Sequence, residues 1–253
     1  MEHSPLDRVQ TRVCDVHGSF ESRNIIRNVW TSCPTCEEKR RAEERAQQER
    51  QETERRERFH RAMLDEAAIP ARFIGRSFEN FRAETDSQRH ALTIAREYAE
   101  DFAEAARKGQ GLIFSGLPGT GKSHLAAAIL QHLLPLDVRY STCLDLIRSI
   151  RETWRKDSEK SERQLLGYLE RLDLLVIDEM GVQYGTEGEQ TILFEILDRR
   201  YREVRPTVLL TNQDKAGLKA YVGDRVFDRL AETCRWVAFD WQSYRPVARR
   251  EVA

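Results

Sequence analysis

The stretch GLPGTGKS, residues 116–123, constrains the fold of this chain more than any other feature. It matches G-x-x-x-x-G-K-[ST] and stands between an apolar run, Leu112 to Phe114, and an alanine-rich helical pattern from His124 onward. Backbone N–H groups of such a loop surround phosphate oxygens at a helix N-terminus, so the loop needs a strand before it and a helix after it. A glycine-rich turn with a chance lysine is the alternative, but it does not require this context. The pattern therefore predicts a nucleotide-binding α/β domain.

The loop residues are expected to hold ATP together with Mg²⁺. Lys122 is expected to reach the β and γ phosphates, and Ser123 to bind Mg²⁺. The other expected nucleotide-binding positions are Gly116, Leu117, Pro118, Gly119, Thr120, Gly121 and His124.

A second apolar run, Leu174 to Ile177, is followed by an acidic pair. Four apolar residues in succession are typical of a strand buried on both faces, and ligands bind at the carboxyl ends of such strands. We expect Asp178 to hold Mg²⁺, directly or through water, and Glu179 to be the general base that polarises the attacking water. An acidic pair after a strand can also be a helix cap. The phosphate loop 55 residues upstream favours catalysis.

A third run, TVLLTNQ, carries Asn212 at its carboxyl end. An amide at that edge of the sheet is expected to place the lytic water, although asparagine is also a common turn residue.

Together these residues resemble the AAA+ ATPases, and within them the DnaC-type replicative helicase loaders. The IstB-like transposition helper ATPases share much of the pattern. The resemblance covers most of residues 74–245 and is carried by SFENF, IFSGLPGTGKSHLAAAI, LDLLVIDEMGVQ, GDRVFDRL and FDWQSYR. It implies an α/β fold with a parallel central sheet and an ATP site shared between subunits of a self-oligomer.

The resemblance also implies roles for three arginines. In GDRVFDRL, Arg229 corresponds to an arginine finger that acts on the γ-phosphate bound by a neighbouring subunit, and Arg225 to a supporting arginine. A rigid, always-charged donor suits the charge that develops on the phosphoryl oxygens. Asn212 corresponds to sensor 1 and Arg245 to sensor 2. Only 13 residues follow Asp240, so a full helical lid is not expected. A solvated helix face is the alternative for Arg225 and Arg229.

Residues 146–172 combine basic side chains with one tryptophan, which is the composition of a single-stranded DNA surface. We expect Trp154, Arg155 and Lys156 to contact DNA, with Arg148, Arg151 and Lys160 nearby. Interspersed acidic residues dilute the charge, and packing of the tryptophan against a helix is the alternative. The resemblance adds a second DNA-contact region, GVQYGTE, residues 181–187.

The N-terminal segment contains two pairs of candidate metal ligands. Cys14 and His17 are separated by two residues, as are Cys33 and Cys36, and 15 residues lie between the pairs. Four such ligands complete a closed tetrahedral site, which predicts a structural Zn²⁺ rather than a catalytic one. A segment this short and polar hardly folds without a bound metal to stabilise it. Two further cysteines are expected to be buried thiols, Cys143 and Cys234.

Composition divides the chain into three parts. Residues 1–36 form the expected zinc-binding module, residues 37–68 a solvated, Glu- and Arg-rich linker helix, and residues 69–253 the ATPase domain. A charged coiled coil is the alternative for the linker. The net charge of −1 provides no global basic field for nucleic acid. With no signal peptide and no apolar run near the ~20 residues of a membrane helix, we expect a cytoplasmic protein without membrane contact.

These features favour an ATPase that loads a replicative hexameric helicase onto single-stranded DNA. Hydrolysis of ATP to ADP and phosphate is expected to time release, and to be weak without self-assembly. A transposition helper ATPase is one alternative, and a non-catalytic ATP-binding adaptor is another. Lys122, Asp178 and Glu179 argue against the adaptor. Helicase binding is assigned to the N-terminal region by its position alone.

Overall fold

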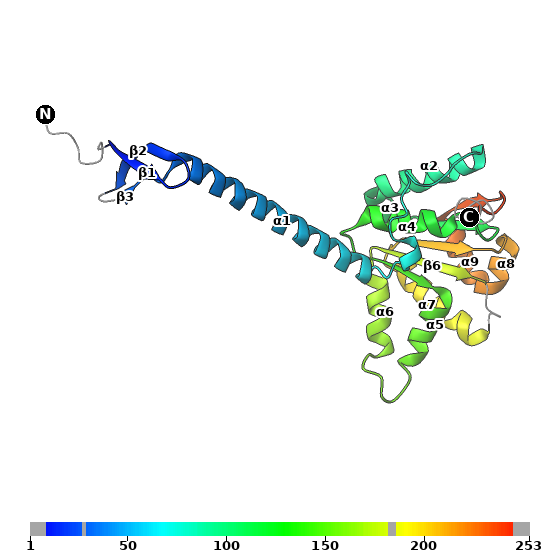
Figure 1. The fold of residues 1–253 in the computed structure, drawn as a ribbon. Helices are drawn as coiled ribbons and strands as arrows, with labels where there is room; N and C mark the ends of the chain where they lie inside the picture. The colour runs from blue at the N-terminus through cyan, green and yellow to red at the C-terminus, as the bar shows by residue number, and fades with distance from the viewer. Residues whose placement is uncertain (1–8, 27–28, 182–185, 245–253) are drawn as a thin grey trace. The chain divides into compact units, whose positions relative to one another are not determined.

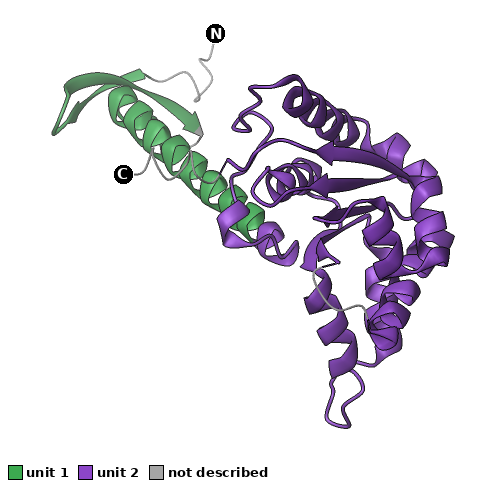
Figure 2. Ribbon diagram, turned by 90° about the vertical axis from the view of Figure 1, so that its right-hand side faces the viewer, with its two compact units in different colours: residues 1–61 green, residues 62–253 purple. Residues whose placement is uncertain are grey.

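The computed structural model of this 253-residue chain describes residues 9–26, 29–181 and 186–244. It divides into two compact units, residues 1–61 and 62–253 (Figure 2). Within the described ranges, none of the helices combines the length and the apolar character that crossing a bilayer requires.

Unit 1 begins with a small antiparallel sheet. β1 (Val9–Cys14) pairs with β2 (Gly18–Ile26), and β2 pairs with β3 (Val29–Trp30). Most apolar side chains of this sheet are exposed, and among the described residues from 9 to 61 Cys33 is the one buried apolar side chain. An apolar core of this size does not hold a sheet together.

The helix that follows, α1 (Pro34–Glu66), begins three residues before the predicted start at residue 37. Proline suits the first turn of a helix because it has no N–H to leave unpaired, and the Glu37 N–H donates to the Cys33 carbonyl (2.9 Å). Every residue from 38 to 62 is exposed. Ion pairs join side chains four residues apart, with N–O distances of 2.7 Å for Glu37–Arg41 and 2.6 Å for Glu52–Arg56. The helix has no apolar seam of the kind that a coiled coil requires.

Unit 2 contains a five-stranded parallel sheet in the order β5-β6-β7-β4-β8, which confirms the predicted fold class. The strands are β4 (Gly111–Gly116), β5 (Val138–Thr142), β6 (Leu174–Met180), β7 (Thr207–Thr211) and β8 (Cys234–Phe239). Their side chains alternate between two cores: Leu112 and Phe114 lie in one, and Ile113 lies in the other.

Helices cover both faces of this sheet (Figure 1). One core contains residues of α2 (Asp86–Glu100), α3 (Phe102–Lys108) and α4 (Lys122–Leu133), which follow the short η1 (Ala71–Phe73). The other core contains residues of α5 (Cys143–Glu152), α6 (Glu162–Arg171), α7 (Glu187–Arg202), α8 (Lys215–Val222) and α9 (Asp224–Thr233). The described chain after β8, residues 240–244, contains no helix.

A buried arginine joins three elements of the second core. The Arg200 side chain is 1% exposed and donates to the carbonyls of Leu169, Leu172 and Pro206 and to the Thr207 hydroxyl, at 2.5–3.0 Å. The guanidinium thus pairs backbone acceptors at the C-terminal end of α6 and before β7 that would otherwise be buried without donors.

Candidate functional site

The phosphate loop joins β4, which lies between β7 and β8, to α4. Two of its glycines are required by close contacts. A Cβ on Gly116 (φ +149°) would lie 2.1 Å from the Phe239 carbonyl oxygen, and a Cβ on Gly121 (φ +99°) 2.6 Å from the Phe81 ring. Only glycine fits both the space and the backbone conformation. The helix that begins at Lys122 directs its N-terminus toward the loop, as anion binding requires.

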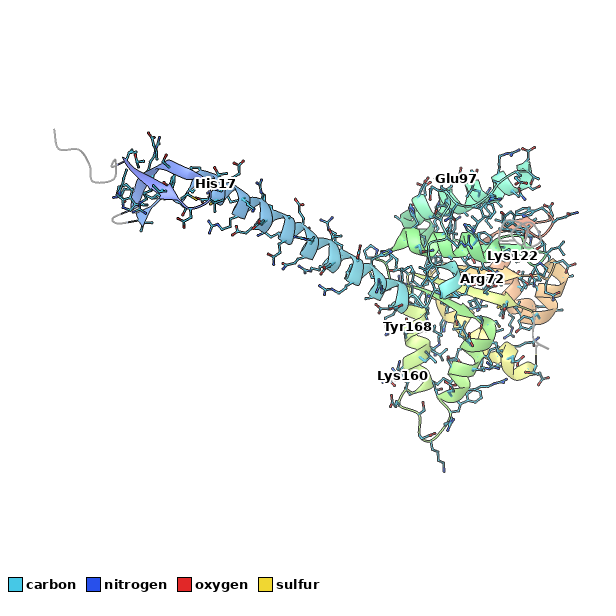
Figure 3. All side chains as sticks on the ribbon, viewed as in Figure 1. His17, Arg72, Glu97, Lys122, Lys160 and Tyr168 are labelled. Carbon is cyan, nitrogen blue, oxygen red and sulfur yellow. The ribbon has the colours of Figure 1, made fainter. Side chains whose placement is uncertain are left out.

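Lys122, labelled in Figure 3, is buried and bends back over the loop. Its Nζ donates to the carbonyl oxygens of Gly116 (2.6 Å) and Leu117 (2.8 Å). Phosphate oxygens carry more negative charge than carbonyls, so a bound nucleotide can take over these donors. The loop also contacts the SFENF segment, because the His124 ring lies edge-on to Phe81 and its Nε2 lies 2.8 Å from the Ser77 carbonyl. Burial lowers the pKa of His124.

The two expected Mg²⁺ ligands lie side by side. Ser123 Oγ donates to Asp178 Oδ2 at 2.9 Å. An octahedral Mg²⁺ with bonds of about 2.1 Å places neighbouring ligands roughly 3 Å apart, so this spacing fits the ion. The Tyr140 hydroxyl also donates to Asp178 Oδ2, and the Glu179 N–H donates to Oδ1 (2.7 Å). Burial, with the Asp178 carboxylate, raises the pKa of Tyr140, so the phenol stays a donor.

Glu179 lies at an irregularity of β6. The predicted strand ended at Ile177, but β6 continues to Met180, and its register with β7 shifts between these two residues. The Thr211 hydroxyl donates to the Met180 carbonyl (2.7 Å), which keeps the strand paired beyond the irregularity. Glu179 has a φ of +60° and is exposed. A bulge and a positive φ re-aim a side chain, here out of the sheet where a water can approach.

Asn212 is exposed and directly follows β7, one residue after the strand ends. Its neighbour Gln213 links the ends of three strands. The Gln213 carbonyl accepts from the Ser115 hydroxyl (2.7 Å), and its Nε2 donates to the Gly181 carbonyl (3.0 Å). Gln213 therefore helps to hold β4, β6 and β7 in line beside the phosphate loop.

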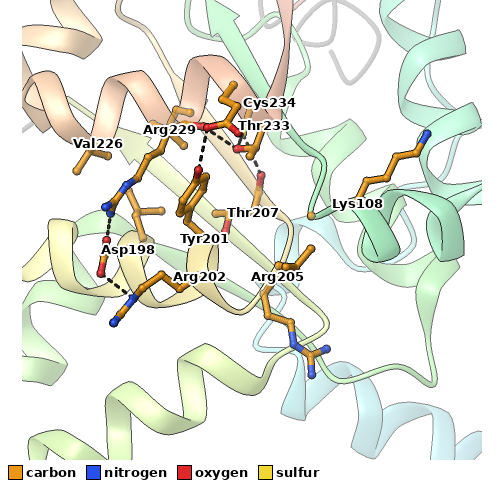
Figure 4. A pocket seen from close by; sticks show the side chains of 15 residues that line it. Lys108, Asp198, Tyr201, Arg202, Arg205, Thr207, Val226, Arg229, Thr233 and Cys234 are labelled. Atoms are coloured by element: carbon orange, nitrogen blue, oxygen red, sulfur yellow. Dashed lines mark hydrogen bonds and ion pairs between the residues drawn. The ribbon is translucent and has the colours of Figure 1, made fainter.

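The two arginines of GDRVFDRL lie on α9 in different surroundings. Arg229 pairs with Asp198 of α7, and its guanidinium lies 5.5 Å from the Phe194 ring centre and 5.0 Å from that of Tyr201. Asp198 also pairs with Arg202 (3.0 Å). Arg229 lines a pocket of about 300 Å³ between α7 and α9 (Figure 4). Its side chain is 31% exposed.

Arg225 differs from Arg229 in that it is exposed and forms no ion pair with the described residues. The third arginine of the expected set, Arg245, lies outside the described residues, as do residues 182–185 of the second DNA-contact region.

The expected DNA-contact residues lie in the turn between α5 and α6, which form a protruding hairpin with Lys160 near its tip (Figure 3). Trp154 is 58% exposed, so it does not belong to a helix-packing core. Its indole N–H donates to Glu162 (2.7 Å), and Arg155 pairs with Asp157 (3.2 Å). Lys156 is exposed, as are Arg148 and Lys160. Arg151 pairs with Glu189 of α7 (3.7 Å).

The four candidate zinc ligands of unit 1 converge. The His17 Nδ1 lies 3.7, 3.6 and 3.3 Å from the sulfurs of Cys14, Cys33 and Cys36, and the sulfurs of Cys14 and Cys36 are 3.6 Å apart. A tetrahedral Zn²⁺ with bonds of about 2.3 Å to sulfur and 2.0 Å to nitrogen separates its ligands by roughly 3.5–3.8 Å. The donor set and spacing therefore fit Zn²⁺. Backbone N–H groups of Val16 and His17 lower the pKa of Cys14 to about 6, which favours the thiolate that zinc binds.

The two remaining cysteines differ. Cys143 is fully buried, as expected, and its sulfur lies 3.3 Å from the Tyr221 hydroxyl. Cys234, which begins β8 at the pocket beside Arg229, is only partly buried as a residue, and its sulfur lies 4.0 Å from the Thr207 carbonyl. Burial raises the pKa of both thiols to about 11, so both stay protonated near neutral pH.

Sequence reasoning missed four residues around the phosphate loop: Tyr140, Gln213, Trp241 and Tyr244. Trp241 Nε1 donates to the Thr120 carbonyl, and the Tyr244 N–H to the Gly119 carbonyl, both at 3.0 Å. The last two stand within the FDWQSYR motif, which was a usable signal. No sequence pattern singles out Tyr140, because its contact with Asp178 depends on the pairing of β5 with β6.

Comparison with known proteins gives consistent matches. The family model described as IstB-like ATP binding protein matches residues 39–252, which excludes the four zinc ligands. The chain is 45% identical to the replicative helicase loader DnaC of Escherichia coli strain K12 over 172 residues, 67% of this chain and 69% of that protein. It is 39% identical to DnaC of Buchnera aphidicola subsp. Schizaphis graminum over 190 residues, 74% and 76% of the two chains. A crystal structure of the DnaC helicase loader matches with a TM-score of 0.60 and 23% identity, over 66% of this chain and 98% of that one, which shows a shared fold.

Proposed function

The chain belongs to the DnaC/IstB-like family of ATP-binding proteins, and we propose that it loads a replicative hexameric helicase onto single-stranded DNA. The observation that carries the proposal is the 45% identity with the helicase loader DnaC over 172 residues. The Lys122 contact with the Gly116 carbonyl and the hydrogen bond from Ser123 to Asp178 support nucleotide use at the carboxyl edge of the sheet. ATP hydrolysis times release of the helicase. Because replication in its bacterial relatives takes place in the cytoplasm, we assign the protein to that compartment.

The positions of the site residues support the following proposed roles. Lys122 binds the β and γ phosphates once it leaves the carbonyls of its own loop. Ser123 and Asp178 hold Mg²⁺, which neutralises charge on the phosphate oxygens. Glu179 accepts a proton from the attacking water, and Asn212 positions that water. The exposure of Glu179 and Asn212 leaves both accessible to solvent.

The client protein is tested by mixing the purified chain with a replicative helicase or a transposase from the same organism. Co-elution with the helicase, and ATP-dependent transfer of the helicase onto single-stranded DNA, support the loader function. The Lys122→Ala variant is the control, because it keeps unit 1 and loses phosphate binding. Capture of the transposase alone supports a transposition helper, which is favoured by the IstB-like description of the matching family. Wild-type protein that binds ATP without turnover would support an adaptor. We assign client binding to residues 1–36.

Self-assembly is proposed from the two arginines of α9. Arg229 acts on the γ-phosphate bound by a neighbouring subunit, and its contacts with Phe194 and Tyr201 support a fixed presentation of the guanidinium. In the isolated chain Asp198 neutralises it, so assembly exchanges this carboxylate for phosphate. Arg225, which is exposed, supports the same interface.

Subunit mixing tests the shared site. Arg229→Ala protein keeps its phosphate loop, and Lys122→Ala protein keeps its Arg229, so a mixed interface can join an intact loop to an intact finger. ATPase activity of the mixture is expected to exceed that of either variant alone. A mixture that stays inactive beside an active wild-type control would show that Arg229 does not act across the interface. Repeating the mixing experiment with Arg225→Ala in place of Arg229→Ala shows which of the two arginines acts on the neighbouring site.

Single-stranded DNA contact is proposed for the α5–α6 hairpin. Trp154 is exposed enough for a base to stack on it, and Lys156 and Lys160 are exposed cations near it. Arg155 forms an ion pair with Asp157, which reduces its expected contribution to DNA binding.

A further inference from the structure

The segment after β8, residues 240–244, contacts the phosphate loop of the same chain at two backbone carbonyls. Trp241 donates to Thr120 and the Tyr244 N–H donates to Gly119, each over 3.0 Å. We propose that this segment, the clasp, holds the phosphate loop in its phosphate-accepting conformation, and that Trp241 is a positioning residue for nucleotide binding. The proposal rests on the proposed use of ATP.

The clasp acts through the geometry of the peptide bond. In a planar trans peptide, the C=O and the N–H of the next residue point in opposite directions, and the peptides of this loop are trans. When the Tyr244 N–H binds the Gly119 carbonyl, the N–H of Thr120 therefore points away from the clasp. When Trp241 binds the Thr120 carbonyl, the N–H of Gly121 points away from the clasp in the same way. Backbone N–H groups are what such a loop offers to phosphate oxygens. Two clasp contacts thus orient two phosphate donors.

The clasp is itself held at both ends, so it can act as a fixed reference for the loop. The Trp241 ring packs on Phe239 (centres 4.8 Å apart), and Phe239 packs on Phe114 in β4 (5.1 Å). At the other end, the Arg82 guanidinium lies 5.3 Å from the Tyr244 ring centre. The clasp donors are therefore anchored to the sheet that carries the loop and to the segment before α2.

The clasp contacts differ from those of Lys122 in what happens when nucleotide binds. Lys122 has to exchange its carbonyl partners for phosphate oxygens. The clasp donors meet the carbonyl side of the Gly119 and Thr120 peptides, whereas the N–H groups that face phosphate point the opposite way. A phosphate held by those N–H groups therefore does not displace the clasp donors. The clasp contacts therefore persist in the nucleotide-bound state and stabilise it, instead of being replaced.

The test removes the indole N–H and keeps an aromatic ring. Trp241→Phe is compared with Trp236→Phe, the same change in β8, where the tryptophan packs with Lys215 away from the loop. Dissociation constants for ATP and ADP are measured by calorimetry. Trp241→Phe is expected to weaken both nucleotides by the same factor, about 2- to 10-fold, since the loop binds phosphates common to both. Turnover at saturating ATP is expected to be unchanged, and Trp236→Phe to bind like wild type.

Two further readouts separate positioning from general stability. Binding of ATP is expected to change the tryptophan fluorescence, and this change should disappear in Trp241→Phe and remain in Trp236→Phe. Tyr244→Pro removes the second donor and should weaken both nucleotides, whereas Tyr244→Ala keeps the N–H and should weaken them less. If the wild type binds both nucleotides and Trp241→Phe binds ATP and ADP as tightly as the wild type does, the proposed role of the clasp is overturned. The proposed function is not affected by that result. Wild-type protein that binds no ATP overturns the proposed function itself.

Discussion

Removal of the metal is expected to unfold the small sheet of unit 1. From residue 9 to residue 61 the described chain buries one apolar side chain, Cys33. Full burial of even a larger side chain such as leucine contributes only about 1.5–3 kcal/mol. Ordering the backbone of β1 to β3 costs roughly 1–2 kcal/mol per residue. A structural zinc in a small peptide supplies about 10–16 kcal/mol. The metal, which four ligand atoms within 4.8 Å of one another can bind, is therefore the dominant stabilising term for this sheet.

The assay combines metal content with hydrogen exchange. Protein purified without chelators should release one equivalent of zinc per chain. After chelation, amides of residues 9–33 should lose protection, whereas those of residues 111–133 should keep theirs, because β4 and α4 lie in the separate core of unit 2. ATP affinity should be unchanged. Cys14→Ser is expected to reproduce the effect of the chelator, and Cys234→Ser, a thiol outside the cluster, is the matched control.

Two results would refute this reasoning. One is a purified protein with no bound zinc and with normal exchange protection in residues 9–33. The other is loss of zinc, by chelation or by Cys14→Ser, that leaves this protection intact. Either result would mean that contacts other than the four ligands hold the sheet.

Three further predictions concern unit 2. Glu179→Gln should bind ATP normally, but its turnover should fall by a factor on the order of 10² or more, since the proton acceptor is lost while the phosphate contacts remain. Binding and hydrolysis measured on the same sample check this, and normal turnover would remove Glu179 from the mechanism. Trp154→Ala should weaken single-stranded DNA binding by about 1–3 kcal/mol with little change in melting temperature, while Trp154→Phe keeps a stacking ring; lost stability with unchanged DNA affinity would contradict this. Arg200→Met should destabilise the domain by about 3–5 kcal/mol in urea unfolding, because it leaves buried acceptors of Leu169, Leu172 and Pro206 without donors; unchanged stability would mean that water replaces the arginine.

Much of the fold follows from local sequence signals. The strand–loop–helix pattern around residues 116–123 and the apolar run at Leu174 predict a parallel α/β sheet, because such runs are stable only when both faces are covered. The charged run from residue 38 predicts a solvated helix, because it offers no apolar stripe to bury. The family resemblance, carried by short motifs, is confirmed by the comparisons.

Element ends were predicted less well. α1 begins at Pro34, where the Cys33 carbonyl pairs with the first turn, so this end is set by neighbouring residues. β6 extends to Met180 because a hydroxyl on β7 holds its last carbonyl. The end of β6 therefore depends on a partner that the segment itself does not contain.

The sequence by itself determined which residue types are available: a phosphate loop, an acidic pair, four zinc ligands and two arginines on one helix. Only the tertiary structure decided their partners. It brought Tyr140 onto Asp178 by pairing β5 with β6, Asp198 onto Arg229 by packing α7 against α9, and Trp241 onto the phosphate loop by placing β8 beside β4. Motifs are short because local geometry needs few residues. Contacts between segments far apart in the chain depend on strand order and register, which no single segment encodes.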